Sequence, residues 1–206
     1  LTFLGDVSLA AIGACAAIYE LLIGFAIGVG NGLSIVTARC YGKNDNDLLK
    51  KSVAGSIVIG IFITISIMII SKLFLFPLLQ LLNTPQNIIE ESYSYISMVT
   101  LFVGVMFIYN LCAGLLRAIG NSFMPLIFLI ISSILNVFLD ILFITEFNMG
   151  IRGAAAATVI AQGGSAILCI VYIFKKAHIL IPSKKHFAID KDLYSELIGQ
   201  GLSMGM

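Results

Sequence analysis

Five long runs of apolar residues constrain what this chain can fold into. They cover residues 21–38, 52–71, 92–116, 118–139 and 153–174. Each run has about the 20 residues that a helix needs to cross the hydrocarbon core of a bilayer. Because the runs are continuously apolar and do not alternate as barrel strands do, they predict helices. The sequence therefore predicts an all-α integral membrane protein, a polytopic helix bundle.

The overall composition also indicates a membrane protein. Of the 206 residues, 59% are hydrophobic and only 11% are charged, and the mean hydropathy is +1.05. Average soluble domains carry about twice that share of charged residues. The formal net charge of +1 gives no indication of a nucleic-acid partner. The four cysteines are scattered singly without a CxxC motif, so neither a zinc site nor a disulfide framework is predicted.

Basic residues collect in alternate connections between the runs. They are Arg39, Lys43, Lys50 and Lys51 after the first run, Arg117 after the third, and Lys175, Lys176, Lys184, Lys185 and Lys191 after the fifth. The other connections, residues 77–91 and 145–152, contain one basic residue between them, Arg152. By the positive-inside rule the first set of connections is cytoplasmic and the second set external.

Asp140 places a carboxylate deep within what otherwise reads as a transmembrane helix. Asn136 and Asp140 are four residues apart and share one helical face, which Ser132 extends by one turn. An ionisable side chain at such a depth is costly in lipid, so it normally faces an interior cavity and moves ions or protons. The alternative is a structural hydrogen bond or a position at the membrane interface.

Thr158 is predicted to lie at the same depth on the next helix. That helix opens with a small-residue surface, residues 153–157, which lets two backbones approach closely. Counting from a turn near residues 146–152, Asp140 lies about 12 Å and Thr158 about 9 Å below the external surface. Asp140, Asn136 and Thr158 are therefore predicted to couple transport to a cation or proton, with a possible Na⁺ at Asp140. For Asn136 and Thr158, a purely structural role in joining helices stays open.

Four further polar residues could line a cavity or its mouth: Glu20, Tyr109, Asn110 and Ser132. Glu20 lies nineteen residues before Arg39, or about 28 Å along a helix, which favours a position at the external interface over a buried one. An amide such as that of Asn110 between packed helices more often holds the helices together.

The chain divides into three predicted segments. Residues 1–180 form an amino-terminal transmembrane lobe, residues 181–195 a cytoplasmic linker between lobes, and residues 196–206 the start of a second lobe. Ile189, Leu193 and Leu197 recur every four residues, which predicts an amphipathic helix on the cytoplasmic surface. We find no signal-peptide pattern, and we expect the chain to be part of a larger transporter-like protein.

Several motifs, in this order and spacing, resemble the amino-terminal half of multidrug and toxic compound extrusion (MATE) transporters. They are Thr2-Phe3-Leu4-Gly5 with Ala10-Ala11-Ile12-Gly13, Ala38-Arg39-x-x-Gly42, Leu116-Arg117-Ala118-Ile119-Gly120-Asn121-x-x-x-Pro125, Asn136-x-x-x-Asp140, and Met149-Gly150-Ile151-x-Gly153-Ala154-Ala155-x-Ala157-Thr158. The resemblance implies two six-helix lobes around a central cavity, joined by a cytoplasmic linker. The five runs would be helices two to six, and the first helix would precede Leu1.

The same resemblance implies a function. Members of the family export organic cations across the cell membrane, driven by inward movement of Na⁺ or H⁺, and need no cofactor beyond that coupling ion. In one branch of the family an Asn and an Asp on helix five and a Thr on helix six serve a cation site, and these match Asn136, Asp140 and Thr158. A further acid on helix one would fall before Leu1, and the second lobe would complete the cavity.

Three other classes of function fit the sequence less well. A related flippase for lipid-linked sugars should have a basic cavity for phosphate, and no Lys or Arg lies in the middle of a predicted span. An intramembrane enzyme would need a nucleophile with a base, or a metal cluster. His178 and His186 both lie in the predicted linker, so we expect no enzyme. A purely structural membrane subunit would explain the hydrophobicity but not Asp140.

Overall fold

The computed structural model describes residues 6–81, 89–90, 93, 103–147 and 149–205, and these residues contain no β-strand. The main helices are α1 (Asp6–Gly42), α2 (Asn46–Leu81), α4 (Val103–Ala118), α5 (Phe123–Ile141), α6 (Gly150–Lys176) and α7 (Lys191–Gly205). Three short helical segments join them: η1 (Leu142–Glu146), η2 (His178–Leu180) and η3 (Lys184–Phe187). The prediction of an all-α chain is confirmed.

Within the described residues, four helical segments are long and apolar enough to cross a membrane: Glu20–Gly42, Asn46–Ile70, Phe123–Glu146 and Gly153–Lys176. They correspond to the first, second, fourth and fifth predicted runs. Residues 92 and 94–102 of the third run lie outside the described residues. Its described residues are 93 and 103–116, and the latter belong to α4. Most of the predicted external connection 77–91 and the motif residues 2–5 also lie outside the described residues.

The apolar run 118–139 includes the turn between two helices, because α4 ends at Ala118 and α5 begins at Phe123. Gly120 has a φ of 87°, a left-handed conformation that ends helices. Its N–H donates to the carbonyl of Arg117 at 2.9 Å, and the N–H of Asn121 donates to the carbonyl of Leu116 at 2.9 Å. These bonds close α4 at Ala118, and α5 therefore starts only at Phe123.

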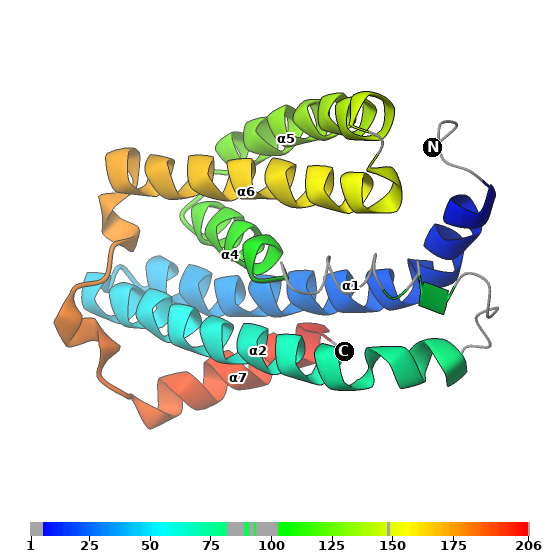
Figure 1. The fold of residues 1–206 in the computed structure, drawn as a ribbon. Coiled ribbons are helices and arrows are strands. Elements are labelled where there is room, and N and C mark those ends of the chain that lie inside the picture. The colour runs from blue at the N-terminus through cyan, green and yellow to red at the C-terminus, as the bar shows by residue number, and fades with distance from the viewer. Residues whose placement is uncertain (1–5, 82–88, 91–92, 94–102, 148, 206) are drawn as a thin grey trace.

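The helices form two layers with α4 between them (Figure 1). α5 and α6 lie side by side in one layer, while α1, α2 and α7 form the other. α4 crosses obliquely and packs against both α6 and α1. The basic connections lie together at one end of the bundle, where Lys185 contacts Asp47 and Arg39 contacts Glu196.

α7 packs along α1, and this differs from the surface helix that was predicted. Leu193 and Leu197 are buried, but Ile189 is 78% exposed and precedes the helix. The apolar spacing continues instead to Gly201, which is also buried. This stripe faces α1, where Leu33 and Val29 lie against Gly201. The helix therefore runs without interruption from Lys191 into the bundle.

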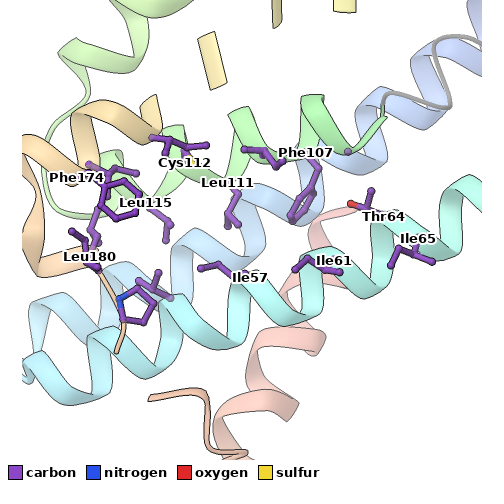
Figure 2. Close-up of a pocket in the computed structure, with 17 residues that line it drawn as sticks. Ile57, Ile61, Thr64, Ile65, Phe107, Leu111, Cys112, Leu115, Phe174 and Leu180 are labelled. Atoms are coloured by element: carbon purple, nitrogen blue, oxygen red, sulfur yellow. The ribbon is translucent and has the colours of Figure 1, made fainter. Parts of the chain in front are cut away.

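A cavity of about 420 Å³ lies between α2, α4 and α6 (Figure 2). Ile57 and Ile61 line it from α2, Phe107 and Leu111 from α4. Leu180, the last residue of η2, and the next two residues line one end. The helices of this face thus enclose apolar space that their own side chains do not fill.

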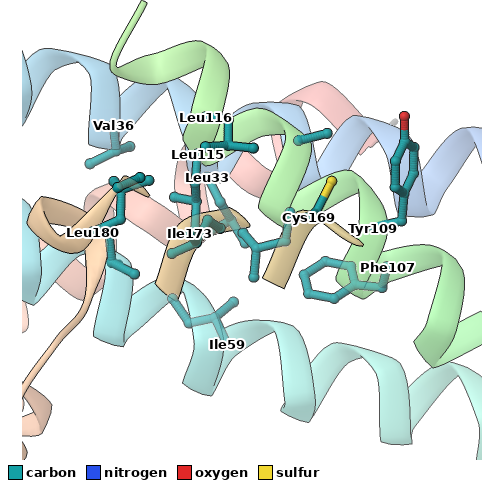
Figure 3. Packing of buried hydrophobic residues seen from close by; sticks show 14 of the residues in the cluster. Leu33, Val36, Ile59, Phe107, Tyr109, Leu115, Leu116, Cys169, Ile173 and Leu180 are labelled. Atoms are coloured by element: carbon teal, nitrogen blue, oxygen red, sulfur yellow. The ribbon is translucent and has the colours of Figure 1, made fainter. Parts of the chain in front are cut away.

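The hydrophobic core lies where α4 meets α1 and α6 (Figure 3). Leu33 of α1 and Leu116 of α4 are fully buried there, and Cys169 and Ile173 join them from α6. Complete burial of a Leu side chain contributes about 1.5–3 kcal/mol in water, although inside a bilayer close packing rather than the hydrophobic effect holds helices together. The core fixes α6, and with it the helix pair α5 and α6.

Candidate functional site

The helix pair α5 and α6 is an antiparallel hairpin with a short turn. η1 continues α5 without a break to Glu146, and α6 begins at Gly150, which has a φ of 55°. The N–H of Met149 donates to the carbonyl of Phe143 at 3.0 Å and ties the two ends together. The turn therefore lies within residues 146–152, where the depth argument from the sequence placed it.

Two side-chain hydrogen bonds fix the register of this hairpin. The hydroxyl of Ser165 donates to the carbonyl of Phe128 at 2.9 Å. Eight residues further along α5, the Nδ2 of Asn136 donates to the Oγ1 of Thr158 at 3.5 Å. The structure therefore brings Asn136 and Thr158 together, as the sequence predicted.

The hydroxyl of Thr158 is oriented by a second bond. It donates to the carbonyl of Ala154 at 3.1 Å, so its single hydrogen points along α6. A hydroxyl has two acceptor lone pairs besides its hydrogen. One accepts the bond from Asn136, and the other stays available to a donor or a cation.

Asp140 lies one helical turn from Asn136, toward the turn of the hairpin. Its side chain is half-buried, and the atom Oδ1 is buried without a hydrogen-bond partner in the described part of the chain. A buried carboxylate oxygen without a partner is strongly unfavourable in a membrane-spanning helix. The atom is therefore a position where a proton or a cation would be stabilising.

These three residues offer oxygen atoms as ligands. Carboxylate, amide and hydroxyl oxygens suit hard cations, whereas transition metals prefer imidazole and thiolate. Among the described residues there is no group of three His, Cys, Asp or Glu side chains that could hold a metal ion. The chemistry of these oxygen ligands therefore suits a hard cation or a proton better than a transition metal.

The other candidates are placed away from Asp140. Tyr109 is buried, and its hydroxyl donates to the carbonyl of Pro125 at 3.2 Å, fifteen residues or about 22 Å along α5 from Asp140. The Nδ2 of Asn110 donates to the carbonyl of Met106 in its own helix at 2.8 Å. These bonds favour structural roles for both.

Glu20 and Ser132 differ from each other in exposure. Glu20 is exposed on α1, while Ser132 is buried on α5, on the same side as Asn136. Glu20 is therefore not buried among the described residues, and its position at the membrane interface stays a prediction. Ser132 extends the polar line of α5 toward the middle of the hairpin.

Sequence reasoning missed Gln162. It lies one turn beyond Thr158 on α6, and its Oε1 is buried without a hydrogen-bond partner among the described residues. The two register contacts place it level with Ser132. The available signal was an amide four residues after Thr158 in an otherwise apolar run. Asp140 and Gln162 thus carry unpartnered oxygens at two levels of the α5 and α6 hairpin.

Comparison with known proteins finds one matching family model and several related bacterial proteins. A family model described as MatE matches residues 1–142. The chain is 30% identical over 207 residues to the probable multidrug resistance protein YoeA of Bacillus subtilis (strain 168), covering 97% of this chain and 45% of that protein. It is 23% identical over 185 residues to the multidrug export protein MepA of Staphylococcus aureus (strain MSSA476), covering 90% and 41%. The chain spans less than half the length of these relatives.

Solved structures show the same fold. An inward-facing multidrug resistance MATE family transporter of the MOP superfamily superposes with a TM-score of 0.91 at 22% identity, covering 98% of this chain and 46% of that one. An outward-facing structure gives a TM-score of 0.91 at 23% identity, with coverage of 98% and 45%. At these identities the similarity concerns the fold alone.

These findings confirm a multi-pass membrane protein with a transporter fold. The family consists of transporters rather than enzymes, which agrees with the prediction that this chain is no enzyme. The chain matches 46% and 45% of these two solved structures, which is a little under half of each. With the family model covering residues 1–142, the chain belongs to the MatE family of multidrug and toxic compound extrusion transporters.

Proposed function

We propose that this chain is part of a secondary antiporter that exports organic cations, including drugs, in exchange for Na⁺ or H⁺. The names of the relatives, multidrug resistance and multidrug export proteins, support the substrate class. One observation supports the ion coupling: the Oδ1 of Asp140 is buried without a partner one turn from the bonded pair Asn136 and Thr158.

In this mechanism Asp140 alternately binds and releases the coupling ion. A buried carboxylate without a partner favours either a proton or a nearby cation, because each removes the cost of an isolated charge. Release then requires water to reach the site. When the cavity opens to only one side of the membrane at a time, loading and release are tied to opposite orientations.

Asn136 and Thr158 would hold the ion beside Asp140. Because the Thr158 hydrogen is engaged by the carbonyl of Ala154, the hydroxyl presents an oxygen lone pair to the site. The amide oxygen of Asn136 is a second neutral ligand, since the nitrogen of this amide is the atom that bonds Thr158. Two neutral oxygens next to a carboxylate suit a cation of charge +1.

The proposal includes the division of the chain. Residues 1–180 form the amino-terminal lobe, residues 181–195 the linker, and residues 196–206 the start of the second lobe. The first helix of the first lobe, with its acid, and the rest of the second lobe would complete the cavity. The organic cation would then bind between the two lobes.

Drug efflux from membrane vesicles that contain the full-length transporter tests the proposal. With an ion gradient imposed, Asp140→Asn should reduce ion-driven efflux at least tenfold, because the variant loses the exchangeable charge. The matched control is Glu146→Gln, which removes a charge from an exposed residue of η1 six positions away. Wild-type efflux by Asp140→Asn would contradict the proposal. Comparing sodium and pH gradients identifies the coupling ion.

A further inference from the structure

The cavity between α2, α4 and α6 is separate from the proposed ion site. Its lining includes none of Asn136, Asp140 and Thr158. Its lining is apolar, and among the described residues that form it Thr64 is the only one with a hydroxyl group. Ile61, Ile65, Ile108 and Phe174 line it while remaining 42–58% exposed. Because these side chains are exposed, the cavity is a groove that is open along one side.

The groove extends from one end of the bundle to its middle. On α2 its lining runs from Val53 to Ile65 (Figure 2), twelve residues or about 18 Å. One leaflet of the hydrocarbon core is about 15 Å thick. The groove thus has the length of one leaflet and the orientation of an acyl chain within it.

The end of the groove lined by residues 180–182 carries positive charge. Phe174 and Pro182 line the groove. Lys175 and Lys176 come directly after Phe174, and Lys184 lies two residues after Pro182. All three lysines are exposed, and none forms an ion pair within the described part of the chain. Residues 175–189 contain four lysines and no acidic residue. By the positive-inside rule this end faces the cytoplasm.

We propose that this groove binds an anionic glycerophospholipid of the cytoplasmic leaflet, with one acyl chain between α2, α4 and α6 and its phosphate against Lys175, Lys176 and Lys184. Basic clusters just cytoplasmic of membrane helices attract anionic headgroups with about 1 kcal/mol per Lys or Arg. The apolar groove alone would accept any lipid. The lysines supply the preference for an anionic one.

Photo-crosslinking tests the proposal on the full-length transporter in nanodiscs of phosphatidylcholine. A small fraction of phosphatidylglycerol or of phosphatidylcholine carries the same diazirine-labelled acyl chain, and labelled peptides are mapped by mass spectrometry. Phosphatidylglycerol should label the groove residues of α2 and α4 several-fold more than phosphatidylcholine does. Equal labelling by both lipids, or no labelling of the groove, would overturn the proposal.

Two sets of variants separate the headgroup from the acyl chain. Lys175→Gln, Lys176→Gln and Lys184→Gln combined should lower labelling by phosphatidylglycerol to the level of phosphatidylcholine. Lys43→Gln with Lys191→Gln, which removes exposed lysines that do not flank the groove, should leave it unchanged. If the first set has no effect on labelling, the headgroup assignment is wrong.

Filling the groove tests the acyl-chain position independently. Cys112 lines the cavity from α4, so Cys112→Phe should reduce labelling of the groove by both lipids. The control is Leu126→Phe, which introduces the same side chain at an exposed position of α5 outside the groove. Undiminished groove labelling in Cys112→Phe, in protein that remains monodisperse, would overturn the proposal. Efflux is not the readout, so this result is independent of the proposed ion coupling.

Discussion

Thr158 is the residue on which the geometry of the candidate site depends most. Its hydroxyl donates to Ala154 and accepts from Asn136, so it links the two helices and still presents one lone pair. A hydroxyl that only closed a bond within its own helix would not need to face α5. The hydrogen bond between Asn136 and Thr158 is also the contact that sets the depth of Asp140.

Replacing Thr158 tests this double role. Thr158→Val keeps the shape but removes the oxygen, so the amide of Asn136 loses its acceptor and the ion loses a ligand. We expect the ion concentration for half-maximal efflux to rise several-fold, which corresponds to about 1 kcal/mol. Thr158→Ser retains the oxygen and should behave nearly as the wild type. An unchanged ion requirement in Thr158→Val would exclude Thr158 from the site.

At the scale of elements, the contact of α7 with α1 depends on two glycines. A Cβ added at Gly28 would collide with the backbone carbonyl of Met204, and one at Gly32 with that of Gln200. Both obstacles are main-chain atoms, which cannot rotate away as a side chain can. Small residues allow such close approach of membrane helices, and here the two glycines let α7 pack directly against α1.

The glycines give a prediction with a control on the same helix. Gly32→Ala should destabilise the detergent-solubilised full-length protein by about 1–3 kcal/mol, because α7 must move away from α1. The control is Gly24→Ala, since a Cβ at Gly24 meets nothing within 4 Å and Ala favours helix. Thermal unfolding midpoints measure both. Equal midpoints for the two variants would show that α7 does not pack this closely in the full protein.

The segment between α6 and α7 is attached to α2 through His186. The Nδ1 of this buried side chain accepts from the N–H of Ser183 at 2.9 Å, so the hydrogen of the neutral ring is on Nε2. Nε2 then donates to the Oδ1 of Asp47 at 3.1 Å. Lys185 reaches the same oxygen at 3.0 Å. The segment is therefore held by bonds to the first turn of α2.

Proteolysis can test this attachment, because Lys184 and Lys185 are trypsin sites on exposed residues. His186→Ala removes the bonds to Ser183 and Asp47, so cleavage after these lysines should become several-fold faster. His178→Ala is the control, since His178 is exposed and belongs to the same segment. Equal cleavage rates in the two variants would mean that His186 does not hold the segment on α2.

For the whole molecule, the sequence predicts the membrane helices because apolar runs of bilayer length have few alternatives. It also predicts the pairing of Asn136 with Thr158, since a short turn between antiparallel helices fixes the depth on both sides. The left-handed conformation of Gly120, which closes α4, cannot be read from the length of an apolar run. The packing of α7 depends on backbone contact with Gly28 and Gly32, which side-chain periodicity does not report.

Gln162 shows the same limit at the candidate site. That its Oε1 has no hydrogen-bond partner among the described residues can be recognised only from the structure. In the sequence, an amide in an apolar run has many possible partners. Asp140 could be identified from the sequence alone, because a carboxylate in a membrane span usually has a functional role. Charge is therefore easier to interpret from sequence than an uncharged polar group.

The central claim, that Asp140 couples ion movement to substrate movement, is tested most directly by measuring both fluxes in the same proteoliposomes. A substrate gradient is imposed across membranes that contain the full-length transporter, and Na⁺ tracer or a pH-sensitive dye records the opposite ion flux. The wild type should move one of these ions in a fixed ratio to substrate, and Asp140→Asn should show no substrate-driven ion flux. Ion flux by Asp140→Asn at the wild-type ratio would contradict the account.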